Sequence, residues 1–280
     1  MNKKYPGVSV MKKLSLFASF ALLLSGCGLM DDRLPMNAEY LGDIAYDAAP
    51  RTGYTVYLQE SGQEYAAVRK QPEGVYFPYL ALTNDYDGST LLLRRDIDEY
   101  HRYNDYRAYY EDSEVDVYLN TVVIGRFPQT LREAIVTSTI TIAEKYRTEV
   151  EPGQFWKVTC QIERKVFLLS GMETGFKYRE AVLPVEGKKL EYFEEIESRI
   201  AYENGEAAPW LLRTPTIVYD SAASAVSPEG LIATLNAFGV SGVRPAFCLP
   251  TTTPITTDDT IVPGETVYVI DYERLAAGDE

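Results

Sequence analysis

Alternation of apolar and polar residues predicts a chain built largely from β-strands. The first clear example is Arg51–Leu58, where Tyr54, Val56 and Leu58 fall on one face of an extended segment. Asp87-Gly88, a pair typical of two-residue hairpin turns, separates two further apolar runs. The other strand candidates are bounded by turn residues: Tyr65–Val68, Val75–Leu82, Thr90–Leu93, Thr137–Ile142, Trp156–Ile162, Lys165–Leu169, Trp210–Arg213, Ala222–Val226, Leu231–Leu235 and Thr266–Ile270.

Helical spacing is confined to a few short segments. Ser113, with Asp116 three residues later, predicts the start of one helix. Thr130 and Glu133 form a capping-box pattern at the start of a second. Apolar residues spaced from Leu190 to Ile200 indicate a third helix. The 22 tyrosines and the many β-branched residues nevertheless favour sheet over helix.

The segment Gly239–Pro250 predicts the last core strand, entered by a glycine turn and ended by a proline. It carries Arg244, and the strand candidate that begins at Trp210 similarly carries Arg213. We interpret both arginines as buried residues that pair with acids or carbonyls, so Arg244→Ala should lower thermal stability. The alternative is that they bind a carboxylate or sugar ligand through bidentate contacts. Trp210 and Phe247 are expected to be structural core residues.

The N-terminal segment has the pattern of a bacterial lipoprotein signal. Lys12 and Lys13 precede the uncharged run Leu14–Leu24, which is too short to cross a bilayer as a helix. The run ends in Leu-Ser-Gly-Cys, so Cys27 is the expected lipidation site and residues 1–26 the cleaved signal peptide. Either Met1 or Met11 fits as the start of this signal. Residues 27–50 are rich in Gly, Asp, Pro and Asn and predict a tether.

Charge argues against some partners. Cleavage of residues 1–26 removes four lysines and no acid, leaving 23 basic and 41 acidic side chains. Such an acidic chain is a poor ligand for nucleic acid or for anionic lipid headgroups. The pattern instead predicts an extracytoplasmic body attached through Cys27 to the outer face of a bacterial cell membrane, of a Gram-positive or a Gram-negative cell.

Two further cysteines, Cys160 and Cys248, lie in apolar, strand-like surroundings. In an exported protein they could form a disulfide, whereas buried free thiols are equally common in such surroundings. Their spacing in the sequence does not decide between these alternatives.

Tyr100, Tyr103, Tyr106 and Tyr109 recur every three residues and form the tyrosine segment. One hypothesis is an aromatic platform for sugar rings, with Arg102 among its polar contacts. The favoured interpretation is a packed, partly exposed loop, because tyrosine supplies apolar area with a polar tip. The only histidine, His101, also lies here and is expected to pack rather than to catalyse.

Several chemistries are disfavoured by the residues present. A serine triad would need His101, and no nucleophile-elbow motif occurs. Histidine and cysteine are too few for a zinc site, and the turn at Gly88 has Thr83 and Arg94 where a calcium loop requires carboxylates. No glycine loop suited to phosphate is present. We therefore expect no metal and no cofactor. A pair of carboxylates acting as in a glycosidase stays open.

Several motifs together resemble a known family. They are Thr90–Leu93, Tyr110–Ser113, Phe127–Thr139, Lys165–Ser170 (KVFLLS) with Glu173, Trp210–Pro215 (WLLRTP), Ser227–Gly230 and Gly242–Phe247 (GVRPAF). Their order over about residues 75–250 is similar to that of a bacterial exported or surface domain of unknown function. That family in turn resembles the C-type-lectin-like fold shared with formylglycine-generating enzymes.

The resemblance implies an α+β fold in which twisted antiparallel sheets are flanked by two or three short helices. It places the C-type-lectin-like domain at residues 51–250, followed by a Thr-rich loop and terminal strand at 251–280. The chain departs from the family in having Tyr110 and Tyr118 in place of tryptophan. It also lacks the calcium-dependent sugar motifs of true lectins. By fold analogy, a copper or oxidase site at the two cysteines is a remote alternative.

These observations predict a lipid-anchored, non-catalytic binding module for a glycan, the cell wall or a protein partner. Its ligand would bind to loops around the tyrosine segment and to the Thr-rich segment after Pro250. The first alternative is an envelope enzyme with clustered carboxylates in a deep pocket. The second is a structural subunit of a surface assembly, which predicts a flat apolar patch in place of a pocket.

Overall fold

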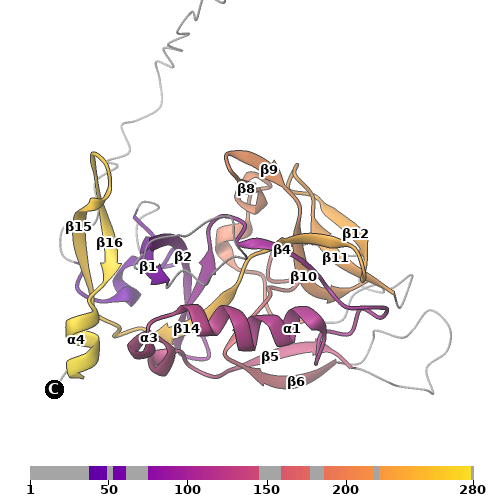
Figure 1. The fold of residues 1–280 in the computed structure, drawn as a ribbon, viewed down its shortest axis with the longest axis horizontal. Coiled ribbons are helices and arrows are strands. Elements are labelled where there is room, and N and C mark those ends of the chain that lie inside the picture. Colours follow the sequence, from indigo (N-terminus) through magenta and orange to yellow (C-terminus); the bar gives the residue numbers. More distant parts are fainter. Residues whose placement is uncertain are drawn as a thin grey trace, which may run out of the picture. The chain divides into compact units, whose positions relative to one another are not determined.

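The computed structural model describes residues 38–48, 53–60, 75–144, 159–176, 186–216 and 221–278, all within the unit that spans residues 32–280. Most of the ordered elements are strands, and the helices are few and short (Figure 1). The protein is therefore mostly β, with mixed sheets, rather than a balanced α+β fold. The predicted strand at Tyr65–Val68, the tether up to residue 37 and Cys27 lie outside the described residues.

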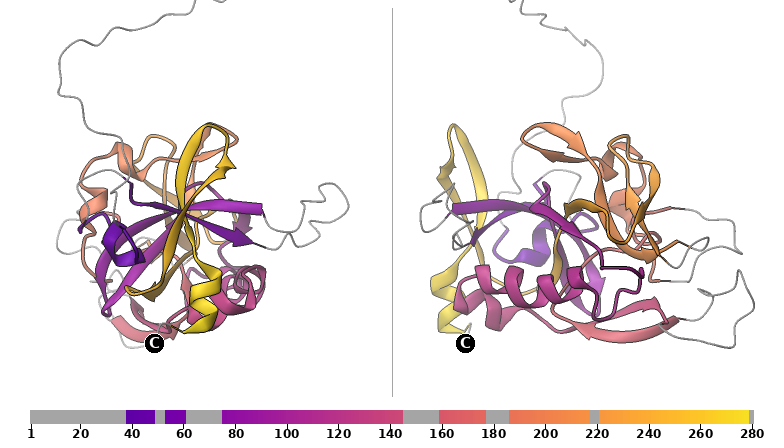
Figure 2. Two further views of the ribbon diagram at one scale, coloured as in Figure 1. Left: turned by 90° about the vertical axis from the view of Figure 1, so that its left-hand side faces the viewer. Right: turned by 45° about the vertical axis from the view of Figure 1, so that its right-hand side comes forward.

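The larger of the two main sheets has seven strands in the order β15-β16-β1-β2-β3-β14-β7. Its strands pair antiparallel, except that β1 and β16 are parallel. Figure 2 shows the yellow β15–β16 hairpin beside the indigo strands of the same sheet. The strand bounds are β1 (Thr55–Glu60), β2 (Val75–Tyr86), β3 (Ser89–Arg94), β7 (Val166–Phe167), β14 (Ala246–Pro250), β15 (Ile255–Val262) and β16 (Glu265–Ile270).

The second main sheet has five strands in the order β12-β11-β10-β13-β4, and it is also mixed because β10 and β13 run parallel. Two separate hairpins, β5–β6 and β8–β9, complete the described strands. The bounds are β4 (Glu99–Arg102), β5 (Ser138–Ala143), β6 (Thr159–Arg164), β8 (Ala201–Glu203), β9 (Glu206–Ala208), β10 (Trp210–Pro215), β11 (Ala222–Val226), β12 (Ile232–Asn236) and β13 (Val240–Val243).

Local sequence signals account for much of this pattern. Val56 and Leu58 are buried on the same face of β1, as their alternation predicts. Asp87 and Gly88 both have positive φ and join β2 to β3 in the two-residue turn predicted for this pair. The strand candidates Ala222–Val226 and Leu231–Leu235, separated by the turn residues Pro228-Glu229-Gly230, also pair as the β11–β12 hairpin. These predictions are confirmed because each depends on residues close together in the chain.

The stretch Gly239–Pro250 forms two strands, where the sequence predicts one. β13 belongs to the five-stranded sheet and β14 to the seven-stranded sheet, so Arg244 and Pro245 form the crossover between them. At the end of β13 the backbone of Gly242 lies close to the backbone of Pro209. Only glycine fits here, because a Cβ at residue 242 would lie 2.7 Å from the carbonyl oxygen of Pro209. The crossover fixes the backbone of Arg244 at the junction of the two sheets.

One helical segment covers residues 114–126 and is interrupted by a π-helical turn. Its parts are α1 (Glu114–Tyr118), η2 (Leu119–Val123) and α2 (Ile124–Arg126). The predicted cap is confirmed, since the Ser113 hydroxyl accepts a hydrogen bond from the Asp116 amide. At the π-turn the Asn120 side chain both accepts from the Val166 amide (3.1 Å) and donates to its carbonyl (2.8 Å). The irregular turn thus ties the helix to strand β7.

Other helical predictions are wrong in detail. Helix α3 (Gln129–Ala134) begins after Pro128, and no side chain caps it, so the capping box predicted at Thr130 does not form. The predicted third helix is two 3₁₀ turns, η3 (Glu191–Phe193) and η4 (Glu197–Arg199). The Thr-rich segment after Pro250 is largely strand β15 rather than a loop, and a further short helix, α4 (Tyr272–Ala277), follows β16. Near the start of the described chain lies the 3₁₀ turn η1 (Leu41–Ile44).

The two cysteines do not form the disulfide that the sequence left open. Cys160 lies in β6 opposite Ile142, and Cys248 lies in β14 opposite Leu91. Both thiols are free. Burial raises the pKa of the Cys248 thiol to about 12, so this side chain stays protonated and behaves as a small apolar residue.

Candidate functional site

Arg213 on β10 is fully buried, and every N–H of its guanidinium has an acceptor. Two of its nitrogens donate to the two carboxylate oxygens of Glu173, at 2.7 and 2.8 Å. The other contacts are to the carbonyls of Thr141, Leu168 and Glu186. This is the structural role that the sequence favours for Arg213, and it leaves no donor for a ligand.

The tyrosine segment does not form a platform. Tyr103 is fully buried, and its hydroxyl donates to the carbonyl of Arg213 at 2.7 Å. Tyr106 is 61% exposed, and Tyr109 is half-buried with its ring beside Arg107. Arg102 is paired with Glu114 on the surface. The ring and hydroxyl of Tyr103 are occupied inside the protein, so sugar binding by this segment stays a prediction for its exposed rings.

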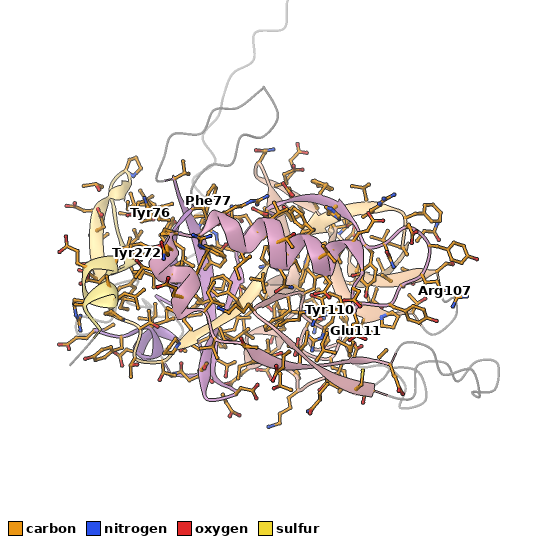
Figure 3. All side chains as sticks on the ribbon, turned by 60° about the horizontal axis from the view of Figure 1, so that its bottom comes forward. Tyr76, Phe77, Arg107, Tyr110, Glu111 and Tyr272 are labelled. Carbon is orange, nitrogen blue, oxygen red and sulfur yellow. The ribbon has the colours of Figure 1, made fainter. Side chains whose placement is uncertain are left out.

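The structure also does not bring the tyrosine segment together with the Thr-rich segment after Pro250. Figure 1 shows β15, β16 and α4 at one end of the described region and the loop after β4 at the other. In Figure 3, Arg107 and Tyr110 likewise lie far from Tyr272 of α4. Thr251 and Thr253 are engaged instead by backbone amides of Gly42 and Leu41. The two segments therefore lie apart in the structure.

Arg244, at the crossover, is equally buried but differently bonded. Its Nε donates to the carbonyl of Arg94 at 3.0 Å, and its Cζ lies 4.6 Å from the ring centroid of Trp210. Trp210 is itself held in place by its indole N–H, which donates to the carbonyl of Arg199 at 2.9 Å. Within the described part of the chain Arg244 has no salt bridge, and its buried Nη1 has no hydrogen-bond partner. A buried cation without a partner is costly, so it requires an explanation.

A cavity of about 760 Å³ lies against Arg244. Its walls come from the β3–β4 connection, from Tyr192 and the η4 turn, and from the β8–β9 hairpin. The hairpin turns through Asn204 and Gly205, which both have positive φ. A volume of this size is typical of sites for small organic ligands. We call it the Arg244 cavity.

Charges around the Arg244 cavity are of both signs. Arg95 and Asp96 form an ion pair with each other at 3.1 Å, and Asp98 is held by Arg126 at 2.6 Å. These internal pairs leave the floor cation, Arg244, facing two exposed acids of the rim, Glu197 and Glu203, for which no salt bridge is seen among the described residues. The cavity therefore combines a positive floor with a negative rim.

The electrostatics of the floor follow from its burial. Burial lowers the pKa of the Arg244 guanidinium to about 10, while Tyr192 and Asp96 act in the opposite direction. The guanidinium thus keeps its charge at neutral pH. Burial also raises the pKa of Tyr192 to about 12, so its hydroxyl, which is hydrogen-bonded to Tyr54, stays protonated. The charged guanidinium of Arg244 can form hydrogen bonds to an anionic group of a ligand, and neither Arg244 nor Tyr192 changes its protonation state near neutral pH.

Behind the cavity wall lies a buried ionic network. Arg94 of β3 pairs with Glu60 of β1, and it approaches Asp98 at 3.4 Å. Arg126 joins the network through Asp98 and through the hydroxyl of Tyr118, at 2.6 Å each. Because Asp98 lies in the wall, the network fixes the position of the β3–β4 connection beside Arg244.

Sequence reasoning singled out Arg244 but missed the rest of the cavity. Asn204-Gly205, flanked by the short strands β8 and β9, is a strong two-residue hairpin signal that would have located one wall. Glu197, Glu203 and Arg95 carry no motif, and only the fold brings them beside Arg244. Of the tyrosine segment, Tyr100 alone reaches this region, since its hydroxyl bonds to Glu203.

The buried carboxylates have structural partners. Glu173 binds Arg213, the Tyr86 hydroxyl and the Ser170 amide. Glu186 accepts from the Ala143 amide and the Thr214 hydroxyl. In the ranges that the structure describes, no cluster of three potential metal ligands occurs, and no helix is long and apolar enough to span a bilayer.

Comparison with known proteins gives one match. A family model described as a domain of unknown function, DUF6273, matches residues 87–251, more than half of the chain. The match begins at the β2–β3 turn and ends just after β14, so it includes Arg213, Glu173 and the Arg244 crossover. No curated protein and no solved structure matches the chain.

Proposed function

This chain belongs to the DUF6273 family, and from that premise we propose that it is a lipid-anchored binding module of the bacterial envelope. The observation that carries the proposal is that Arg244 lines a cavity of about 760 Å³ while its buried Nη1 has no hydrogen-bond partner among the described residues. Burying a guanidinium without an acceptor is unfavourable, and a ligand carboxylate or other acceptor would offset that cost.

The fold and location are part of the same proposal. The protein has two mixed sheets of short strands, few helices and long loops between the elements. This architecture is compatible with an exported domain of the C-type-lectin-like fold, in which loops supply the binding site. The sequence pattern around Cys27 supports attachment of this domain to the outer face of the membrane, through a lipid. The candidate ligands are a glycan, a cell-wall fragment or a protein partner.

Replacement of Arg244 tests the site. We expect Arg244→Met in the full chain to weaken ligand binding at least about tenfold, because a charged hydrogen bond contributes about 1.5–3 kcal/mol. The free energy of unfolding should stay within about 1 kcal/mol of the parent, since methionine keeps apolar contact with Trp210 and removes an unpaired buried charge. Titration calorimetry against glycans, cell-wall fragments and short peptides, together with urea unfolding, gives both quantities.

Two matched variants locate the site. Arg132→Met removes an exposed arginine outside the cavity and should bind like the parent. Tyr106→Ala removes the most exposed ring of the tyrosine segment. Loss of binding in Tyr106→Ala with full binding in Arg244→Met would place the site at the tyrosine segment instead. Strong destabilisation by Arg244→Met would show that this arginine is structural, as the sequence analysis favours.

Lipid attachment is tested at Cys27. Cys27→Ser should reduce the membrane-bound fraction of the full chain at least about tenfold, because the proposed acyl chains are all attached through Cys27 and serine cannot carry them. Membrane fractionation and the intact mass of the purified chain provide the measurement. An unmodified Cys27 in the parent chain would contradict the proposed anchoring.

A further inference from the structure

The Arg244 cavity carries information about its ligand, and the inference drawn from it rests on the proposed binding function. The floor of the cavity is lined by Arg244, a buried guanidinium whose Nη1 has no hydrogen-bond partner among the described residues, whereas two exposed carboxylates, Glu197 and Glu203, lie at the rim. The remaining lining charges are already neutralised by one another or by the ionic network behind the wall. A ligand must therefore satisfy a cation inside and anions at the entrance.

A simple anion does not fit this arrangement well. Phosphate or sulfate would find one guanidinium at the floor, but Glu197 and Glu203 would repel it at the rim. A neutral sugar can donate hydroxyl hydrogen bonds to the rim acids and accept from the guanidinium, but it carries no charge to balance either region. A plain cation would be attracted to the rim and repelled by the floor. None of these complements both regions.

A zwitterion complements both. We infer that the Arg244 cavity binds an amino acid or a short peptide with both termini free, whose carboxylate contacts Arg244 while its ammonium group lies between Glu197 and Glu203. A ligand carboxylate would supply the acceptor that Nη1 lacks among the described residues, in the planar geometry that guanidinium and carboxylate share. The ammonium group has three donors for the rim oxygens.

The walls suit such a ligand in size and character. Two extended residues span at most about 7 Å, and the cavity of about 760 Å³ holds a peptide of that length with its side chains. Leu80 and Ile97 provide apolar lining, and the Tyr192 hydroxyl, which is hydrogen-bonded to Tyr54, keeps an oxygen lone pair that can accept from a peptide N–H. The Trp210 ring lies 4.6 Å from the Cζ of Arg244, a cation–π contact that stabilises the position of the guanidinium.

The experiment uses the full chain and a series of alanine peptides, which carry no side-chain charge. Alanine, Ala-Ala and Ala-Ala-Ala are titrated by calorimetry at pH 7, beside N-acetyl-Ala-Ala, Ala-Ala amide, acetate and inorganic phosphate. We expect saturable binding of at least one free peptide. Blocking either terminus should weaken that binding at least about tenfold, and phosphate should not bind.

Variants connect each terminus to its residues. Arg244→Met should weaken the binding of the free peptide and of the N-acetyl peptide by the same factor, because it removes the contact to the peptide carboxylate. The double variant Glu197→Gln/Glu203→Gln should weaken the binding of the free peptide only. The affinities of the free and N-acetyl peptides should then become equal. The matched control Glu195→Gln/Glu206→Gln changes two exposed acids that do not line the cavity, and it should leave the preference intact.

The outcomes separate this inference from the proposed function. Equal affinity for the free and N-acetyl peptides would contradict recognition of the ammonium group and overturn the zwitterion inference. Binding of a carboxylate at Arg244 would remain supported. Binding of a glycan but of no peptide, lost in Arg244→Met, would also overturn the inference and keep the binding module. Absence of binding by every probe would overturn both.

Discussion

Arg213→Met is expected to lower the free energy of unfolding by about 3–5 kcal/mol, the largest effect of any single substitution considered. The substitution leaves Glu173 buried with only the Tyr86 hydroxyl and the Ser170 amide as partners. It also leaves the carbonyls that Arg213 binds without this donor. For a chain of this size the melting temperature should fall by about 6–20 °C. Urea denaturation and calorimetry measure both changes.

A second substitution at the same pair tests the reason for the loss. Adding Glu173→Leu removes the carboxylate that Arg213→Met leaves uncompensated, so the double variant should lose less than the sum of the two single variants. Arg102→Met is the matched control, because its partner Glu114 lies on the surface and such pairs contribute about 0–1 kcal/mol. Additive losses, or a loss below about 1 kcal/mol in Arg213→Met, would contradict the buried-pair explanation.

Glu186→Gln is expected to remove a pH dependence of stability worth about 3 kcal/mol. Glu186 is fully buried, and burial raises its pKa from 4.5 to about 7. Between these values the folded chain binds more protons at this site than the unfolded chain. The stability of the parent therefore falls as the pH rises from about 4.5 to about 7, and this contribution is constant above and below that window.

Glutamine fits the site in the neutral state that burial favours. Its carbonyl oxygen can accept from the Ala143 amide, and its NH₂ group can donate to the Thr214 hydroxyl oxygen. The free energy of unfolding of the variant minus that of the parent should therefore increase by about 3 kcal/mol between pH 4.5 and pH 7.5. Urea unfolding of both chains at intervals of pH gives this difference directly.

The comparison between chains is needed because Glu60 is a second buried carboxylate whose pKa burial raises, and it titrates in both. Glu194→Gln, at an exposed position, controls for the loss of one negative charge. Identical pH slopes for Glu186→Gln and the parent would show that Glu186 is ionised without penalty in the folded chain.

The two buried arginines show where prediction from sequence stops. Both occur as lone cations in apolar strands, so the sequence correctly places them in the core. Arg213 pairs with a carboxylate 40 residues away in the sequence, whereas the hydrogen-bond acceptor seen for Arg244 among the described residues is a carbonyl 150 residues away. No local pattern distinguishes these environments, because the distinguishing atoms come from other elements.

The tyrosine segment shows the same limit. A repeat of three residues does not specify which ring turns inward. Tyr103 is buried because its hydroxyl reaches the backbone of β10, and Tyr106 is exposed because it lies at the tip of the loop between β4 and α1. Selection of the buried ring depends on a strand more than 100 residues further along the chain.

The sequence by itself determined the features that depend on neighbouring residues. Those are the positions of most described strands, the hairpins at Asp87-Gly88 and around Gly230, and the helix cap at Ser113. Turn chemistry, alternation and capping act within a few residues. Only the tertiary structure decided that the strand expected at Gly239–Pro250 divides between two sheets. It thereby placed Arg244 at a cavity without an ion-pair partner among the described residues, because sheet membership is set by long-range pairing and packing.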